Sequence, residues 1–115
     1  MPTLTRIAPE LPVANLAQSI AYYEAKLGFQ TALTMPERNY AVVERDKVAI
    51  HLFQTAEGKT GSLHVFTEGV DELYTELKGR GARITQPVTL KPWGARDFRV
   101  LDDSGNELKF TEPIA

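Results

Sequence analysis

The chain has 115 residues, the common size of one domain, and we expect a single domain over residues 1–115. Its 13 basic and 15 acidic residues give a formal charge of −2 without any run of like charge, which argues against a nucleic-acid partner. The chain has no cysteine, so disulfides, thiolate metal sites and a cysteine nucleophile are excluded. Residues 1–10 lack the apolar core of a signal peptide and no stretch has the length of a membrane span, so we expect a cytoplasmic protein with no membrane partner.

Two segments have helical periodicity. In the first, apolar side chains recur every three or four positions: Leu16, Ile20, Tyr23 and Leu27. Asn15 is the expected N-cap of this helix, and Gly28 is its expected end. In the second segment the same spacing is shown by Val70, Leu73, Tyr74 and Leu77. Gly79 and Gly81 are expected to end the second helix.

Short alternating segments around these helices predict six strands: Phe29–Met35, Tyr40–Arg45, Val48–Gln54, Ser62–Thr67, Phe98–Asp102 and Glu107–Thr111. Residues 46–47 and 103–106 separate neighbouring strands and are typical of hairpin turns, which makes these strand pairs antiparallel. The adjacent carboxylates Asp102 and Asp103 are therefore expected to be turn residues.

The two halves of the chain match each other. Residues 40–53 align with residues 98–111 without a gap, and apolar positions coincide, as Ile50 does with Leu108. Strand, helix and three strands therefore occur twice, at about residues 3–55 and 60–113. We expect an α+β domain in which two βαβββ repeats form a curved mixed sheet around a cleft. A generic α+β sandwich is the alternative, but one order of elements fits both halves.

Three strings carry a family resemblance. Residues 11–29 end in Leu-Gly-Phe, residues 69–74 read Gly-Val-Asp-Glu-Leu-Tyr, and residues 93–106 contain Trp-Gly-x-Arg-x-Phe followed by Asp-x-x-Gly-Asn. The chain resembles the bleomycin resistance proteins of the glyoxalase/bleomycin resistance/dioxygenase (vicinal oxygen chelate) superfamily from about Ile7 to Glu112. The resemblance implies the glyoxalase/bleomycin resistance fold and a homodimer with clefts at the subunit interface.

The resemblance also locates the metal ligands of the superfamily's enzymes, at the positions of Ala8, His51, Ser62 and Lys109. Of these only His51 is a good ligand, because alanine has no donor atom and lysine brings a positive charge. We therefore expect a metal-free site with no cofactor and no catalytic residues. The alternative is a metal-dependent glyoxalase-like lyase or dioxygenase that uses His51, His64 and Glu107.

Strand alternation and the resemblance together select ligand-binding candidates. Alternation sends His51, Phe53, His64, Phe66 and Lys109 to the face opposite the helices. The resemblance matches the family's drug-stacking aromatic residues to Tyr40, Phe66 and Trp93. The predicted ligand-binding set is Tyr40, His51, Phe53, His64, Phe66, Trp93 and Lys109.

The expected function is antibiotic resistance of the bleomycin type, by non-catalytic binding and sequestration of a planar aromatic small molecule. Lys109, His51 and His64 predict a neutral or somewhat positive cleft, which leaves a neutral or anionic ligand open beside the cationic bleomycin. Arg96 and Arg99 would pair with an anionic group of such a ligand. A third hypothesis is a small sensory or accessory domain without a ligand, in which Trp93 is buried against a partner chain.

Overall fold

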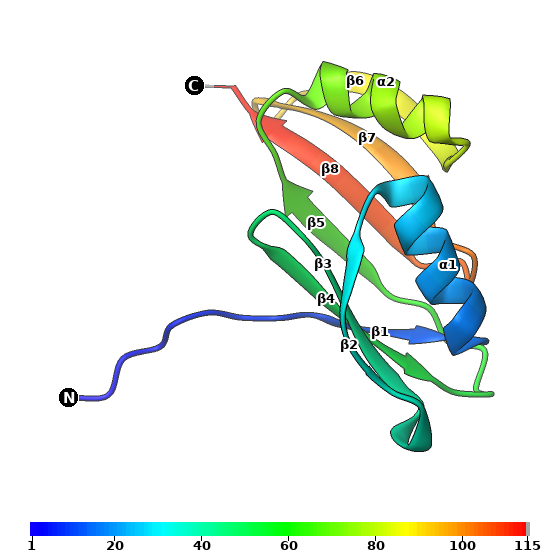
Figure 1. Ribbon diagram of the computed structural model, residues 1–115. Coiled ribbons are helices and arrows are strands. Elements are labelled where there is room, and N and C mark those ends of the chain that lie inside the picture. The colour runs from blue at the N-terminus through cyan, green and yellow to red at the C-terminus, as the bar shows by residue number, and fades with distance from the viewer. Residues whose placement is uncertain (115) are drawn as a thin grey trace.

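Each half of the chain folds as strand, helix and three strands in the computed structural model, which describes residues 1–114 (Figure 1). The first half consists of β1 (Glu10–Val13), α1 (Leu16–Leu27), β2 (Gln30–Met35), a short 3-10 helix (Pro36–Arg38), β3 (Tyr40–Arg45) and β4 (Val48–Gln54). The second half consists of β5 (Ser62–Phe66), α2 (Val70–Arg80), β6 (Arg83–Lys91), β7 (Ala95–Leu101) and β8 (Glu107–Pro113). The predicted repeat of elements is confirmed.

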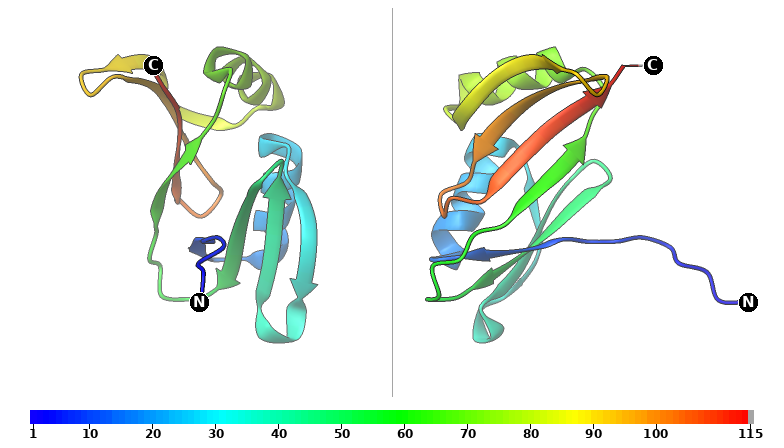
Figure 2. Two further views of the ribbon diagram at one scale, coloured as in Figure 1. Left: turned by 90° about the vertical axis from the view of Figure 1, so that its left-hand side faces the viewer. Right: turned by 180° about the vertical axis from the view of Figure 1, so that it is seen from behind.

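The strands form two mixed sheets of four strands each, in the orders β1-β4-β3-β2 and β5-β8-β7-β6. In each sheet the first strand of the half runs parallel to the last, and the hairpins β3-β4 and β7-β8 are antiparallel as predicted. The parallel pairs set two registers that matter below: Glu10 lies beside His51, and His64 lies beside Lys109. Each half thus makes its own curved sheet, seen from the side in Figure 2.

Two local predictions need correction. The strands β1 and β6 were not among the six predicted, because β1 is short and contains Pro12, and because Pro87 and several polar residues interrupt the pattern of β6. Proline is tolerated there because β6 is an edge strand, and its pairing with β7 is irregular around that residue. The expectation that Gly79 helps to end α2 is wrong, since the helix continues to Arg80 and ends at Gly81, whose φ is +87°.

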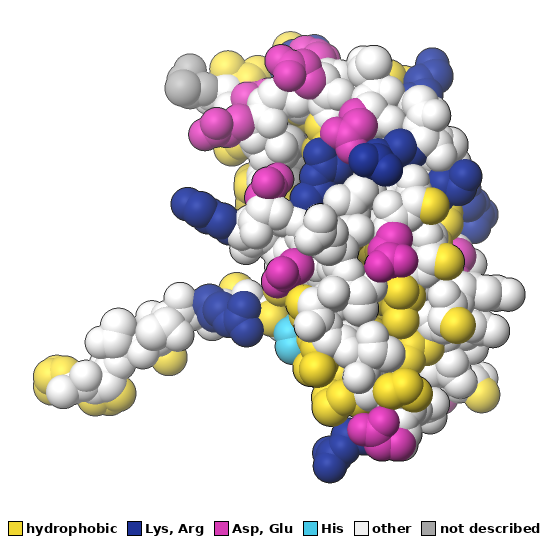
Figure 3. All heavy atoms as spheres, viewed as in Figure 1, with side chains coloured by type: hydrophobic (Ala, Val, Ile, Leu, Met, Phe, Trp, Pro, Cys, Tyr) yellow, Lys and Arg dark blue, Asp and Glu magenta, His cyan; other side chains and the backbone are white. Residues whose placement is uncertain are grey.

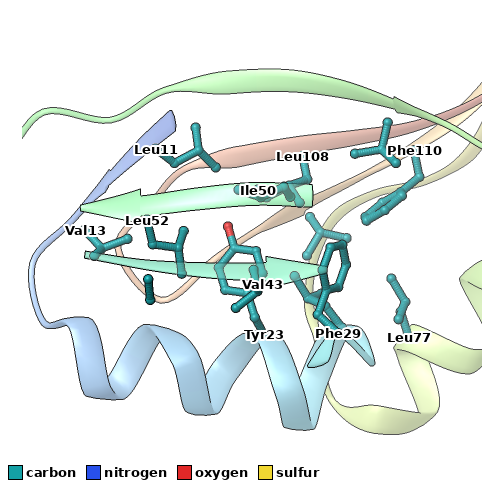
Figure 4. Close-up of a cluster of buried hydrophobic side chains, with 14 of the residues drawn as sticks. Leu11, Val13, Tyr23, Phe29, Val43, Ile50, Leu52, Leu77, Leu108 and Phe110 are labelled. Atoms are coloured by element: carbon teal, nitrogen blue, oxygen red, sulfur yellow. The ribbon is translucent and has the colours of Figure 1, made fainter. Parts of the chain in front are cut away.

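One continuous core lies between the helices and both sheets (Figure 4). Tyr23 and Leu52 enter it from the first half, and Leu77 and Leu108 enter it from the second, all fully buried. Strand residues that alternate with the predicted ligand-binding residues also belong to this core, namely Ile50, Leu52, Val65, Leu108 and Phe110, while Val48 and Leu63 are partly buried and pack against it. A shared core indicates that the two halves fold as one unit.

A buried polar cluster joins the halves at the turn between β7 and β8. Asp102 accepts hydrogen bonds from the Tyr23 hydroxyl and from Asn106 Nδ2, each at 2.9 Å, and from the backbone N–H groups of Ser104 and Asn106. Asn106 Nδ2 also donates to the carbonyl oxygen of Pro12 at 2.8 Å. The Asp-x-x-Gly-Asn string is therefore a structural element, and its first aspartate is a turn residue as expected.

The segment before β1 leaves the body of the molecule. Figures 1 and 3 show it as an extended arm that stands clear of the rest of the chain. Its apolar side chains Met1, Leu4 and Ile7 are fully or almost fully exposed. Within residues 1–114, no helix has the length and apolar character needed to cross a membrane.

Candidate functional site

The predicted ligand-binding residues lie on the face of each sheet that is turned away from the helices, here called the open face. The first sheet carries half-site A, which we define as Glu10, Tyr40, His51 and Phe53. The second sheet carries half-site B, which we define as His64, Phe66, Lys109 and Thr111 together with Trp93 at the β6-β7 turn. Except for Thr111, these side chains are partly or fully exposed, as expected of residues that do not face the core.

Half-site A is organised by the hydroxyl of Tyr40. This hydroxyl donates to Glu10 Oε2 at 2.7 Å and lies 2.6 Å from Nδ1 of His51. The rings of Tyr40 and His51 meet edge to face, with centroids 5.5 Å apart. Desolvation and the hydrogen bond to Glu10 raise the pKa of Tyr40 to about 12, so its phenol stays protonated at neutral pH.

Glu10 was not among the predicted site residues. The parallel pairing of β1 with β4 brings it beside His51, and this pairing joins residues that are far apart in the sequence. Its place on the open face follows from strand alternation with Leu11 and Val13, which are buried. This alternation is hard to recognise in the sequence, because β1 has only four residues and contains Pro12.

Half-site B offers a flat aromatic surface. The rings of His64 and Phe66 are nearly parallel, with an interplanar angle of 20° and centroids 6.1 Å apart. Phe66 is 67% exposed, which is unusual for a large apolar residue in a strand. His64 Nδ1 contacts the Thr111 hydroxyl at 3.3 Å, and Lys109 Nζ lies 3.6 Å from a carboxylate oxygen of Glu107. This surface can stack a planar ligand beside a partly neutralised cation.

Asp97 lies on the open face of the second sheet and is fully buried there. Its Oδ1 accepts from Gln86 Nε2 at 2.7 Å and lies 3.7 Å from Lys91 Nζ, while Arg99 Nη2 approaches its Oδ2 at 3.8 Å. The sequence analysis did not select this carboxylate. Strand alternation could have found it, because Asp97 precedes the core residue Phe98 and must point to the opposite face. Two of the cations on this face are thus set against a buried negative charge.

Trp93 lies at the tip of the β6-β7 hairpin, where it is 65% exposed. Lys91 Nζ is 5.9 Å from the centre of its ring, within the range of a cation–π contact. Arg96, expected to meet an anionic ligand, instead makes a two-pronged ion pair with Asp71 at 2.7 and 2.9 Å. The guanidinium group of Arg96 is therefore already engaged.

The two half-sites do not meet within one chain. Among residues 1–114, no hydrogen bond, ion pair or ring contact joins a residue of half-site A to one of half-site B. A crevice of about 690 Å³ does lie between the halves, but it opens between the β3-β4 turn and the start of α2. It shares only Phe66 with half-site B, so it is not the predicted cleft.

The residues proposed for a metal site are also dispersed. His51 belongs to the first sheet, and His64 and Glu107 belong to the second. In the part of the chain that the structure describes, no three histidine, aspartate or glutamate side chains form a group that could hold a metal ion. Of Ala8, His51, Ser62 and Lys109, the positions that the resemblance matches to the superfamily's metal ligands, only His51 is a good ligand.

Comparison with known proteins decides the family. The sequence profile of the Glyoxalase/Bleomycin resistance protein/Dioxygenase superfamily matches residues 3–110. The chain belongs to this superfamily. Proteins named bleomycin resistance protein from Geobacillus stearothermophilus and from Staphylococcus aureus are each 33% identical to it, over 92% of this chain and 95% of theirs. The family resemblance predicted from the three sequence strings is confirmed.

Solved structures of other proteins have the same fold. The bleomycin resistance determinant encoded on transposon Tn5 superposes with a TM-score of 0.85 at 19% identity, covering 96% of this chain and 98% of that one. The bleomycin-binding protein of bleomycin-producing Streptomyces verticillus, in complex with copper(II)-bleomycin, gives a TM-score of 0.84 at 23% identity and covers 97% and 98%. TioX from Micromonospora sp. ML1 gives 0.81 at 24% identity and covers 96% and 99%.

Proposed function

We propose that this superfamily member sequesters a planar aromatic small molecule of the bleomycin type and confers resistance without transforming the molecule. The observation that carries the proposal is the pair of aromatic and polar half-sites on the open faces of the two sheets. Half-site B supplies the parallel rings of His64 and Phe66, and half-site A supplies Tyr40 and Phe53. The names of the 33% identical relatives supply the ligand class.

We infer that the working unit is a homodimer in which half-site A of one copy faces half-site B of the other. The N-terminal arm supports this, because Met1, Leu4 and Ile7 expose apolar surface that a monomer leaves in water. An exposed arm of about nine residues can lie along a second copy and order both half-sites around one cleft. Trp93, at its exposed hairpin tip, then becomes a wall or rim of that cleft.

The charges of the half-sites suit a ligand that carries positive charge. The sequence suggested a neutral or positive cleft from Lys109, His51 and His64. Glu10 adds a carboxylate to half-site A, and Asp97 and Glu107 lie against the cations of the second sheet. Bleomycin is therefore compatible with these walls.

The proposal includes no catalytic step. In half-site B the hydroxyl of Thr111 lies 3.3 Å from His64 Nδ1, but Thr111 is buried and its hydroxyl is not open to a substrate. In half-site A, His51 is held by a tyrosine hydroxyl rather than by a carboxylate of a catalytic dyad. A metal-dependent lyase or dioxygenase would need His51 of one copy to meet His64 and Glu107 of the partner copy. Metal analysis of the purified protein distinguishes the two functions.

The test is a titration of the purified protein with bleomycin in the presence of a chelator, followed by the fluorescence of Trp93, the only tryptophan. We expect saturable quenching at one bleomycin per subunit, since each dimer would contain two clefts. A folded protein that shows no saturable change, either in fluorescence or in calorimetry, would exclude sequestration of this drug.

A further inference from the structure

The hydrogen bonds of half-site A determine where the protons lie. A carboxylate can only accept hydrogen bonds, and a tyrosine hydroxyl has a single proton to donate. Tyr40 gives that proton to Glu10 Oε2 at 2.7 Å. The contact of 2.6 Å between the Tyr40 oxygen and His51 Nδ1 therefore needs a proton on Nδ1. His51 is the donor in this contact.

The other ring nitrogen of His51 then has a defined role. In a neutral imidazole with a proton on Nδ1, Nε2 carries a lone pair and acts only as an acceptor. Nε2 makes no hydrogen bond within residues 1–114. His51 is partly buried, but its Nε2 atom is not, so solvent reaches this nitrogen. An exposed acceptor on the open face is available to a ligand.

We propose that Glu10, Tyr40 and His51 form a hydrogen-bond relay that presents Nε2 of His51 as the acceptor of the binding cleft. The relay makes Glu10 and Tyr40 positioning residues, because they fix the tautomer of His51. The inference rests on the proposed binding function and adds a statement about the ligand. A bound molecule must place an N–H or O–H donor at this point, as a carboxamide, an amine or a protonated nitrogen heterocycle does.

The charge of Glu10 strengthens this selection. The relay connects the Glu10 carboxylate to the His51 imidazole through the Tyr40 hydroxyl. The negative charge of Glu10 polarises these hydrogen bonds, so Nε2 binds a positive or strongly polarised donor more tightly. A ligand that offers a carboxylate or carbonyl oxygen at the same point meets a lone pair and is disfavoured. Half-site A therefore selects donors, whereas stacking on half-site B selects planarity.

The tautomer can be observed in the free protein by long-range 1H-15N correlation of the histidine rings at pH 8. The chain has only two histidines, so the variant His64→Asn assigns both, and His64 in the other variants reports that the fold is intact. We expect His51 to be protonated on Nδ1 in the wild type. The variants Tyr40→Phe and Glu10→Gln are expected to give a mixture of tautomers. Glu44→Gln removes a carboxylate from the neighbouring strand β3 and is expected to leave His51 unchanged.

A proton on Nε2 in the wild type, or an unchanged tautomer in Tyr40→Phe, would overturn the relay.

The second measurement uses bleomycin. On saturation, the 15N resonance of Nε2 should shift, and Glu10→Gln should weaken binding about threefold to tenfold, the value of one hydrogen bond, while Glu44→Gln should not. Binding with an unmoved Nε2 resonance would exclude the acceptor role and leave sequestration standing. Absence of bleomycin binding would exclude the proposed function, while the tautomer of the free protein would still decide on the relay.

Discussion

The hydroxyl of Tyr23, in the middle of α1, donates to Asp102 at 2.9 Å, and both side chains are fully buried at the junction of the two halves. Burial, followed by the nearby charge of Asp102, raises the pKa of Tyr23 well above its ordinary value, so this phenol is always a donor. The bond links the first repeat to the turn that closes the second repeat. It explains why the aspartate of the Asp-x-x-Gly-Asn string serves the fold and not the ligand.

Removal of this hydroxyl should destabilise the protein. Tyr23→Phe takes one donor from a buried carboxylate, and we expect a loss of about 1–3 kcal/mol in the free energy of unfolding. Tyr74→Phe is the matched control, because the Tyr74 hydroxyl makes no hydrogen bond in the described part of the chain. Urea denaturation measures both variants. Equal midpoints would show that the junction does not depend on this bond.

A second link between the halves predicts a dependence of stability on pH. Arg45 from β3 makes a two-pronged ion pair with Glu76 of α2 at 2.9 and 2.7 Å, and Arg80 adds a third contact at 2.9 Å. Hydrogen bonds from Arg45, followed by those from Arg80, lower the pKa of Glu76. When the pKa of a carboxyl group is lower in the folded state than in the unfolded state, the group stabilises the folded state at pH values above the unfolded pKa. This stabilisation is lost as the pH falls through the folded-state pKa.

We therefore expect part of the stability to disappear as the pH falls from the ordinary glutamate pKa, about 4.3, to below the lowered pKa. The pair is partly exposed, so the effect after solvent screening is about 1 kcal/mol. Thermal melts of the wild type and Glu76→Gln between neutral and acid pH measure it. The difference between the two proteins should shrink with acidification. A difference that stays constant over that range would contradict the assignment.

The N-terminal arm should control assembly. Leu4→Asp combined with Ile7→Asp places charges on the exposed apolar positions of the arm, and we expect the dimer to weaken at least about tenfold. Thr3→Asp combined with Thr5→Asp adds the same charges at polar positions of the same arm and serves as the control. Sedimentation velocity over a range of concentrations measures the dissociation constant. A monomeric wild type, or dimers unaffected by the first pair, would remove the arm from the interface.

The elements that the sequence predicted are those with local signals. The helix α1 begins at Asn15, whose side chain caps the N–H of Gln18, and ends at Gly28 with a φ of +73°. The strands β3 and β4 have the predicted bounds, because their alternation is regular and their turn is short. The repeat of 14 residues with matched apolar positions then gave the order of elements.

What the sequence could not predict depends on partners that are distant in the chain. Glu10 meets Tyr40 across 30 positions, and Glu112 caps the start of α2 by accepting from the N–H groups of Gly69 and Val70 across 43 and 42 positions. Gly69 offers no side chain for that cap, so the helix gave no signal of where its cap would come from. The separation of the half-sites likewise follows from the packing of the two sheets and not from any local pattern.

The central claim is that each ligand cleft combines half-site A of one copy with half-site B of another, and mixed dimers test it most directly. Tyr40→Ala with His51→Ala disables half-site A, and His64→Ala with Phe66→Ala disables half-site B, so neither homodimer should bind bleomycin. When the two variants are coexpressed, about half of the dimers are mixed, and each mixed dimer regains one intact cleft. We predict recovery of about a quarter of the wild-type binding capacity in calorimetry. No recovery in a sample shown to contain mixed dimers would contradict the account, because it would place each cleft within a single chain.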